Sequence, residues 1–130
     1  MRTKEEIVAF RLLKSASDLE AVRSLIAFRH WDVAMNRLYY AAFHAVSALL
    51  RQHDIKAKAH AGAKAMLDLH FVKTGKLAVN WGKFYAQLFD ERNDSDYEDF
   101  AVFSANDVLP LLPQTEEFIA LIKELITKAA

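Results

Sequence analysis

The sequence predicts an all-α protein, and three observations support this fold class. Only three Gly and two Pro occur among the 130 residues, and the rest is rich in Ala, Leu, Lys and Glu, which favour helices. Apolar residues recur at intervals of three and four along most of the chain. Residues 34–50 are apolar on nearly every side, as in a helix buried at the centre of a bundle. We therefore predict one domain, residues 1–130, folded as an up-and-down four-helix bundle with an additional kinked C-terminal helix.

The composition excludes several classes of function. The chain contains no cysteine, which excludes a disulfide framework, a thiolate metal site and a cysteine nucleophile. Acidic residues stand where a signal peptide would carry its apolar run, and no uninterrupted apolar stretch reaches the length of a membrane span. We therefore expect a cytoplasmic protein with no membrane partner.

The zero net charge conceals an asymmetry along the chain. Residues 1–83 contain fourteen Lys or Arg against seven Asp or Glu, whereas residues 84–130 contain three against ten. The two parts should attract each other: within one chain this attraction steers helix pairing, and between copies it favours a two-fold or head-to-tail association. A nucleic-acid footprint on the basic part is the alternative interpretation.

A first helix is predicted over about residues 4–28. Its apolar stripe has helical spacing and consists of Val8, Leu12, Ala16, Leu19, Val22 and Ile26. The break that follows is short, and Asp32 is a suitable N-cap for a second helix that runs to about Arg51. A short connection makes these two helices an antiparallel hairpin.

A line of polar residues crosses the otherwise apolar second helix. Asn36, Tyr40, His44 and Ser47 are spaced by four, four and three, and Arg37 lies at the edge of the line. One interpretation is that these groups form hydrogen bonds to neighbouring helices, since buried polar groups are nearly always satisfied. The other is that they floor a pocket or a dimer seam, with Arg37 binding an anion and Tyr40 orienting it.

A third helix is predicted over about residues 59–73. Gly75 suits the left-handed position just beyond its end. His53, His60 and His70 are too far apart in sequence to form a local pair of metal ligands, so we expect surface or capping histidines and no metal site.

A fourth helix, about residues 79–92, leads into an acidic stretch, FDERNDSDYEDF, in which Arg92 is the only cation. One interpretation is a solvated acidic turn in which residues 93–95 end the helix. The other is that Arg92, held between Asp96 and Tyr97, is the fixed cation of a phosphate site. Because a buried guanidinium without a partner is costly, we also expect Arg37 to pair with a carboxylate, with Asp96 as the predicted partner.

The C-terminal segment is predicted to begin at Ser104, with Asp107 in the first turn of the helix that it caps. Pro110 and Pro113 should kink this helix or divide it. An apolar stripe follows from Phe118 onward.

Four segments together carry a resemblance to a known family. They are NRLYYAAFHAVSALL in the second helix, KAHAG at the start of the third, the FVKTGKL connection, and RNDSDY after the fourth. Over about residues 5–128 the chain resembles the HEPN family, the "higher eukaryotes and prokaryotes nucleotide-binding" helical domains. The resemblance implies a helical bundle that dimerises, a partner of the minimal nucleotidyltransferase type, and a ligand that is RNA or a nucleotide. It also implies kinship with metal-independent ribonuclease toxins, whose signature is an Arg followed, four to six residues on, by a His.

That signature is incomplete in this chain. Counting from Arg92, the positions where the family carries histidine hold Tyr97, Glu98 and Asp99. Cleavage of RNA without a metal needs a base for the 2′-hydroxyl proton and a cation for the phosphate, roles suited to His and Arg. Tyr, with a reference pKa of about 10, is a poor base at pH 7.

Two functional hypotheses follow. The first is a HEPN module without efficient catalysis that binds a nucleotide or RNA phosphate at Arg92, dimerises through the fourth helix and the RNDSDY segment, and works with a nucleotidyltransferase-type partner in a toxin–antitoxin-like system. The second is an active endoribonuclease toxin in which His44 takes the missing role. The candidate catalytic residues are Arg92, Tyr97 and His44, the candidate ligand-binding residues are Arg37, Tyr40, Asn93 and Asp96, and no cofactor is expected.

Overall fold

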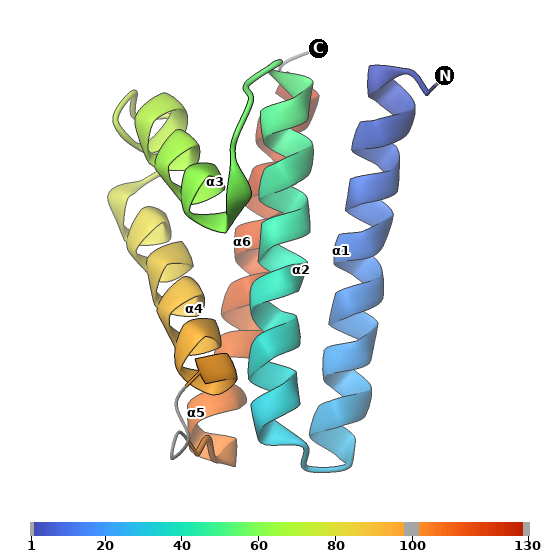
Figure 1. The fold of residues 1–130 in the computed structure, drawn as a ribbon, viewed down its shortest axis with the longest axis vertical. Coiled ribbons are helices and arrows are strands. Elements are labelled where there is room, and N and C mark those ends of the chain that lie inside the picture. Colours follow the sequence, from blue (N-terminus) through green and yellow to red (C-terminus); the bar gives the residue numbers. More distant parts are fainter. Residues whose placement is uncertain (1, 98–101, 129–130) are drawn as a thin grey trace.

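The architecture is a bundle of helices arranged around α2. The computed structural model describes residues 2–97 and 102–128, without the side chains of residues 93–97. The elements are α1 (Lys4–Ala27), α2 (Trp31–Gln52), α3 (Ala59–Leu67), the π-helix η1 (Asp68–Val72), α4 (Val79–Tyr97), α5 (Ala105–Val108) and α6 (Leu111–Lys128). Figure 1 shows α2 in the middle, with α1 on one side, α3 and α4 on the other, and α6 behind it. The all-α prediction is confirmed. Within the described ranges, no helix has an apolar stretch that would cross a membrane.

The burial of α2 confirms the sequence prediction for this helix. Its fully enclosed side chains form one broad face, and they include Met35, Leu38, Tyr39, Val46 and Leu49 together with the alanines at positions 41, 42, 45 and 48. The polar line on the remaining side is only partly buried. Helices α1, α3, α4, α5 and α6 all pack against it. Because alanine side chains are short, neighbouring backbones come close to α2 on several sides.

The first helix packs mainly against α2, but its inner face differs from the predicted stripe. Val8, Ser15 and Val22 are its buried residues, at a spacing of seven, whereas Ala16 is exposed. The buried Ser15 hydroxyl donates a hydrogen bond to the carbonyl of Ala41 at 2.7 Å. A polar side chain therefore occupies the inner face because α2 offers it a backbone acceptor at close range.

The start of α2 corrects one prediction. The N-cap position is His30, and Asp32 lies within the first turn of the helix. The carboxylate of Asp32 accepts a hydrogen bond at 3.1 Å from the backbone N–H of Phe103, so it anchors the distant C-terminal segment to α2. An acidic side chain in the first turn also suits the positive end of the helix dipole.

The segment predicted as one third helix is divided into α3 and the π-helical η1, which ends at Val72. Gly75 has φ of 80°, the left-handed conformation that its position after the helix predicted. Helix α4 continues through Tyr97, so the prediction that residues 93–95 end the helix is wrong. Asn, Asp and Ser are only modestly unfavourable in a helix, so their presence at positions 93–95 does not end it.

The C-terminal segment follows the prediction closely. The backbone N–H of Ser104 donates to the carboxylate of Asp107 at 2.8 Å, which fixes the start of α5. The chain then breaks at Leu109 and Pro110 before α6 begins at Leu111. Since proline removes a helical hydrogen bond and crowds the preceding turn, this break is the expected division of the last helix.

The contact between Ser15 and Ala41 predicts how closely α1 and α2 must approach. Ser15→Ala should lower the free energy of unfolding by about 1 kcal/mol, because it removes one buried hydrogen bond. Ser15→Leu should cost about 1–3 kcal/mol more, because the added side chain has no space against α2. Urea unfolding followed by circular dichroism measures both changes. Equal stability of the parent and the leucine variant would show that the two helices are not held at this distance.

Candidate functional site

Tyr40 of α2 stands at the centre of a group of charged side chains. The guanidinium of Arg92, from α4, donates a hydrogen bond to the Tyr40 hydroxyl at 3.0 Å. The guanidinium carbons of Arg92 and Arg37 lie 5.5 Å and 4.4 Å from the centroid of the Tyr40 ring. Both distances are in the range of cation–π attraction. The structure therefore brings together Arg37, Tyr40 and Arg92, three residues that the sequence marked as candidates.

Arg37 is held from two sides. Its Nη1 lies 3.1 Å from a carboxylate oxygen of Asp18 on α1, and its Nε and Nη2 donate to the side-chain oxygen of Asn36 at 3.3 Å and 3.1 Å. The carboxylate partner that the structure shows is thus Asp18. The expected pairing with Asp96 concerns a side chain outside the described part of the chain.

His44 lies one turn from Tyr40 and faces the same carboxylate. Its Nε2 is 3.5 Å from the second oxygen of Asp18, a long distance for a hydrogen bond. That oxygen is buried and accepts no hydrogen bond from the described residues. Burial lowers the pKa of His44 from its usual value, Lys14 and Arg37 lower it further, and only Asp18 opposes them. The imidazole is therefore held in its neutral form at pH 7.

These side chains line a pocket of 420 Å³ between α1 and α2. Its walls are Lys14, Ser17, Asp18, Arg37, Tyr40 and His44, so two cations face one carboxylate. The polar line of the second helix thus floors a pocket over Arg37, Tyr40 and His44. Ser47 does not belong to it, since it lines a different pocket, which Arg11 also borders.

His60 is a member of this neighbourhood that the sequence pattern assigned to the surface. Its Nδ1 lies 2.8 Å from the Tyr39 hydroxyl, and its ring is 5.6 Å from the Tyr40 ring. Burial lowers the pKa of His60, and the charge of Arg92 lowers it further. Ala59, just before it, has φ of 60°, a strained value that turns the chain into α3. Spacing could not reveal His60, because the loop that brings it to Tyr39 has no periodic pattern; only the KAHAG segment of the family resemblance pointed to it.

The remaining candidates lie at the end of α4. Asn93, Asp96 and Tyr97 belong to its last two turns, and their side chains are outside the described part of the structure. Their roles as ligand-binding and catalytic residues stay predictions. Among the side chains that the structure does describe, no three His, Cys, Asp or Glu lie close enough together to hold a metal ion.

Comparison with known proteins places the chain in a family. The family model described as HEPN domain matches residues 8–125. A UPF0332 protein of Thermotoga maritima is 33% identical over 126 residues, which cover 97% of this chain and 96% of that protein. The chain belongs to the HEPN domain family.

Two further relatives come from Methanocaldococcus jannaschii, and both carry names that describe them as candidate toxins. One is 32% identical over 98 residues, or 75% of this chain and 66% of the relative. The other is 34% identical over 95 residues, or 72% of this chain and 69% of the relative. The matches thus extend well beyond the second helix.

The role of Asp18 can be tested by removing its charge. Asp18→Asn should lower the free energy of unfolding by about 1–3 kcal/mol, because it weakens a charged hydrogen bond to the half-buried Arg37. Urea unfolding at neutral pH measures the loss. Glu20→Gln, on the same helix, is the matched control, since the Glu20 side chain is 76% exposed and its ion pair with Arg23 should contribute little. If both variants unfold like the parent, Asp18 does not hold Arg37 in place.

The lowered pKa values predict how stability depends on pH. The folded state keeps His44 and His60 neutral more strongly than the unfolded chain does, so the unfolded chain binds more protons below about pH 6.5. This contribution to stability is complete above about pH 6.5 and is lost as the pH falls through the folded pKa values.

His60→Gln should therefore reduce the loss of stability between about pH 7.5 and pH 5. Urea unfolding across that range, with variant and parent side by side, measures the slope. His30→Gln is the control, because His30 is exposed at the turn between α1 and α2. Identical slopes for the parent and His60→Gln would contradict the lowered pKa of His60 in the folded protein.

Proposed function

We propose that this protein is a HEPN module that binds the phosphate of RNA or of a nucleotide, and that Arg37 and Arg92 are its phosphate-binding residues. The observation that carries the proposal is the convergence of both guanidiniums on the ring of Tyr40, at 4.4 Å and 5.5 Å. They come from different helices, α2 and α4, so the fold itself places them together. Guanidinium groups present planar sets of donors that match phosphate oxygens.

The arrangement also gives the cations a fixed geometry. Asp18 and Asn36 hold the guanidinium of Arg37, and the Tyr40 hydroxyl accepts a hydrogen bond from Arg92. Donors fixed before the ligand arrives lose less conformational entropy on binding than free side chains do. The phosphate would thus meet a preorganised pair of cations beside a polar pocket.

The proposal includes a homodimer and a protein partner of the nucleotidyltransferase type, acting in a toxin–antitoxin-like system. Support comes from the resemblance of the whole chain to this family, from the basic and acidic halves of the sequence, and from the names of the archaeal relatives. The predicted dimer contact involves α4 and the RNDSDY segment. Light scattering at micromolar concentration should give the mass of two chains, and the mass of one chain would contradict the dimer.

A second candidate function is cleavage of RNA without a metal, as in the toxins of this family. The specific observation in its favour is His44, which is neutral at pH 7, faces the carboxylate of Asp18 and lies in the same pocket as Arg37. A neutral imidazole can take the proton of a 2′-hydroxyl while a guanidinium stabilises charge on the phosphate. Arg92 then serves both hypotheses, and only the base distinguishes them.

Binding of single-stranded RNA tests the first function. The affinity should fall steeply with salt, because each phosphate contact releases counterions. Arg92→Gln should weaken binding by about tenfold and reduce the salt slope by about 0.7, the value for one contact to a single strand. Fluorescence anisotropy with a labelled oligoribonucleotide measures both quantities. Lys123→Gln on α6 is the control, because it removes an exposed charge outside the site. Equal affinities of Arg92→Gln and the parent would exclude Arg92 as the phosphate anchor.

Cleavage of the same RNA separates the two functions. If the site lacks its base, the parent should cleave slowly or not at all, and Tyr97→His should raise the rate, since it restores a histidine at the family's spacing. If His44 is the base, the parent should cleave without added metal and His44→Gln should lose about 100-fold in rate. Tyr97→Phe should then have little effect. Gel analysis of product formation over time distinguishes the two patterns.

A further inference from the structure

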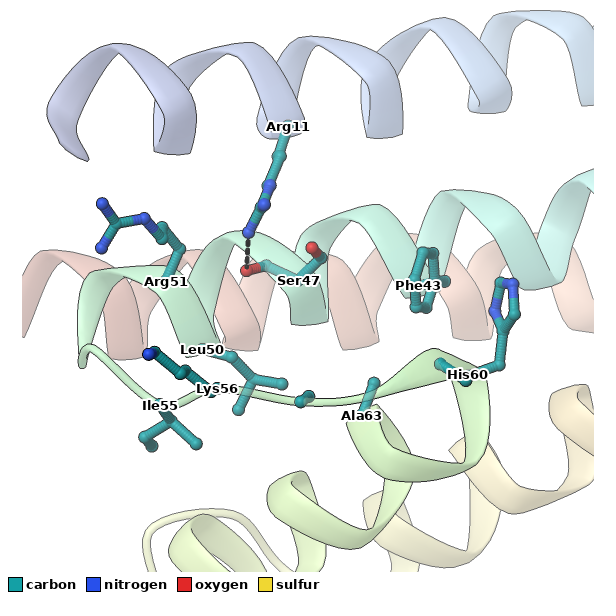
Figure 2. Close-up of a pocket in the computed structure, with 11 residues that line it drawn as sticks. Arg11, Phe43, Ser47, Leu50, Arg51, Ile55, Lys56, His60 and Ala63 are labelled. Atoms are coloured by element: carbon teal, nitrogen blue, oxygen red, sulfur yellow. Dashed lines mark hydrogen bonds between the residues drawn. The ribbon is translucent and has the colours of Figure 1, made fainter. Parts of the chain in front are cut away.

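A second pocket, lined by Phe43 and His60 and not by Arg37 or Tyr40, has the composition of a binding site. It has a volume of 430 Å³ and lies between α1, the second half of α2 and the loop that leads into α3. Pockets for small organic ligands have volumes of about 300–1,000 Å³. Figure 2 shows Arg11 reaching into it from α1, with Arg51 and Lys56 toward one end and Phe43 and His60 at the other.

The charge around this pocket is strongly positive. Arg11 donates to the backbone carbonyl of Ser47 at 3.1 Å, and it forms no ion pair with a carboxylate that the structure describes. Asp54, the nearby acid, lies 3.1 Å from Arg51 and also 3.4 Å from Lys4, so two cations share its charge. Lys56 adds a further cation at the rim.

Arg11 and Arg51 are close enough to repel each other. Burial lowers the pKa of Arg11, and the positive charge of Arg51 lowers it further. Like charges held together at the edge of a pocket cost free energy in the absence of a ligand, and a bound anion relieves that cost. Since both residues line the pocket, the arrangement favours an anion inside it.

The other end of the pocket is apolar and aromatic. The rings of Phe43 and His60 lie 4.3 Å apart between centroids and form a wall, with Ala63 nearby (Figure 2). Leu50 and Ile55 also line the pocket, nearer to Arg51 and Lys56. The His60 Nδ1 is engaged by the Tyr39 hydroxyl at 2.8 Å, which fixes the orientation of this ring. A flat, weakly polar group suits such a surface, because aromatic side chains stack on nucleobases of every kind.

We propose that this pocket binds an organic phosphate with a flat aromatic body, of the size and chemistry of a nucleoside monophosphate. The phosphate lies among Arg11, Arg51 and Lys56, and the base lies beside Phe43 and His60. This site is separate from the pair of Arg37 and Arg92, and it does not rest on the function proposed above. The nucleotide is either free or the end of an RNA strand, since both present the same chemistry.

Binding of AMP, adenosine and inorganic phosphate to the whole protein tests the composition of the site. Isothermal titration at low salt should show saturable binding of AMP with a Kd below about 1 mM, and adenosine and phosphate should each bind at least about tenfold more weakly. AMP should also raise the melting temperature, because it binds only the folded state. Phosphate that binds as tightly as AMP would overturn the assignment of the aromatic end.

Charge-removing variants test which residues hold the phosphate. Arg11→Gln should weaken AMP binding by at least about tenfold. Because the shorter amide does not take over the hydrogen bond to the Ser47 carbonyl, the melting temperature of this variant is measured alongside. Lys56→Gln, in the loop before α3, should weaken AMP by about threefold or more and provides a second variant with little risk to folding. Phe43→Leu should weaken AMP by about fivefold or more and leave phosphate unchanged. Lys123→Gln should bind like the parent.

Arg92→Gln keeps the outcome distinct from the test of the proposed function. Because Arg92 belongs to the site of the proposed function, AMP binding is also titrated in this variant, where adding Arg11→Gln should still weaken it by at least about tenfold. Loss of all saturable AMP binding in Arg92→Gln alone would place the nucleotide at Arg37 and Arg92 and overturn the proposal. A 5′-phosphorylated tetraribonucleotide distinguishes a free nucleotide from the end of an RNA strand. If it binds at least about tenfold more tightly than AMP, and Arg92→Gln removes that advantage, the pocket holds the end of an RNA strand. If the tetraribonucleotide and AMP bind with equal affinity, the ligand is a free nucleotide. The proposal is overturned if neither AMP nor the tetranucleotide binds saturably, or if AMP binds equally to the parent, Arg11→Gln and Lys56→Gln.

Discussion

The burial of the broad apolar face of α2 is the constraint on which the rest of the structure depends. An apolar helix face this broad must be covered by several neighbours, and α1, α3, α4 and α6 each cover part of it. The polar groups that α2 carries must then find partners on those same neighbours, since an unsatisfied polar group in a core is costly. Asp18 of α1 forms an ion pair with Arg37, and Arg92 of α4 donates a hydrogen bond to the Tyr40 hydroxyl. The helix packing that covers the apolar face of α2 therefore also brings the charged residues together.

The features that could be predicted from the sequence are those that depend on local pattern. Helical periodicity gave the bounds of the first two helices to within about two residues, a common margin for helix ends. The left-handed Gly75 and the break at Pro110 followed from the backbone preferences of single residues. The polar line on α2 is visible from its spacing, so helical periodicity alone groups Arg37, Tyr40 and His44.

The partners of these residues could not be predicted, because they come from other helices. Asp18 lies on α1 and looks, in sequence, like any solvent-facing acid, yet it serves both Arg37 and His44. Asp32 was predicted to be an N-cap because it stands at the start of a helix. In the structure its carboxylate instead accepts a hydrogen bond from the backbone N–H of Phe103. His60 is placed beside Tyr39 by the irregular loop between α2 and α3. Pairing across elements depends on the relative rotation of helices, which periodicity alone does not determine.

The same charges shape both functions considered for the site between α1 and α2. Burial lowers the pKa of His44, and Lys14 and Arg37, the two cations of the same pocket, lower it further. A base for a 2′-hydroxyl must be neutral before it acts, and the cations that would hold the phosphate help to keep it neutral. Asp18 acts against this effect by favouring the protonated ring, while it fixes the guanidinium of Arg37. Asp18 therefore has two effects in this pocket: it fixes the position of Arg37, and it limits how far the pKa of His44 is lowered.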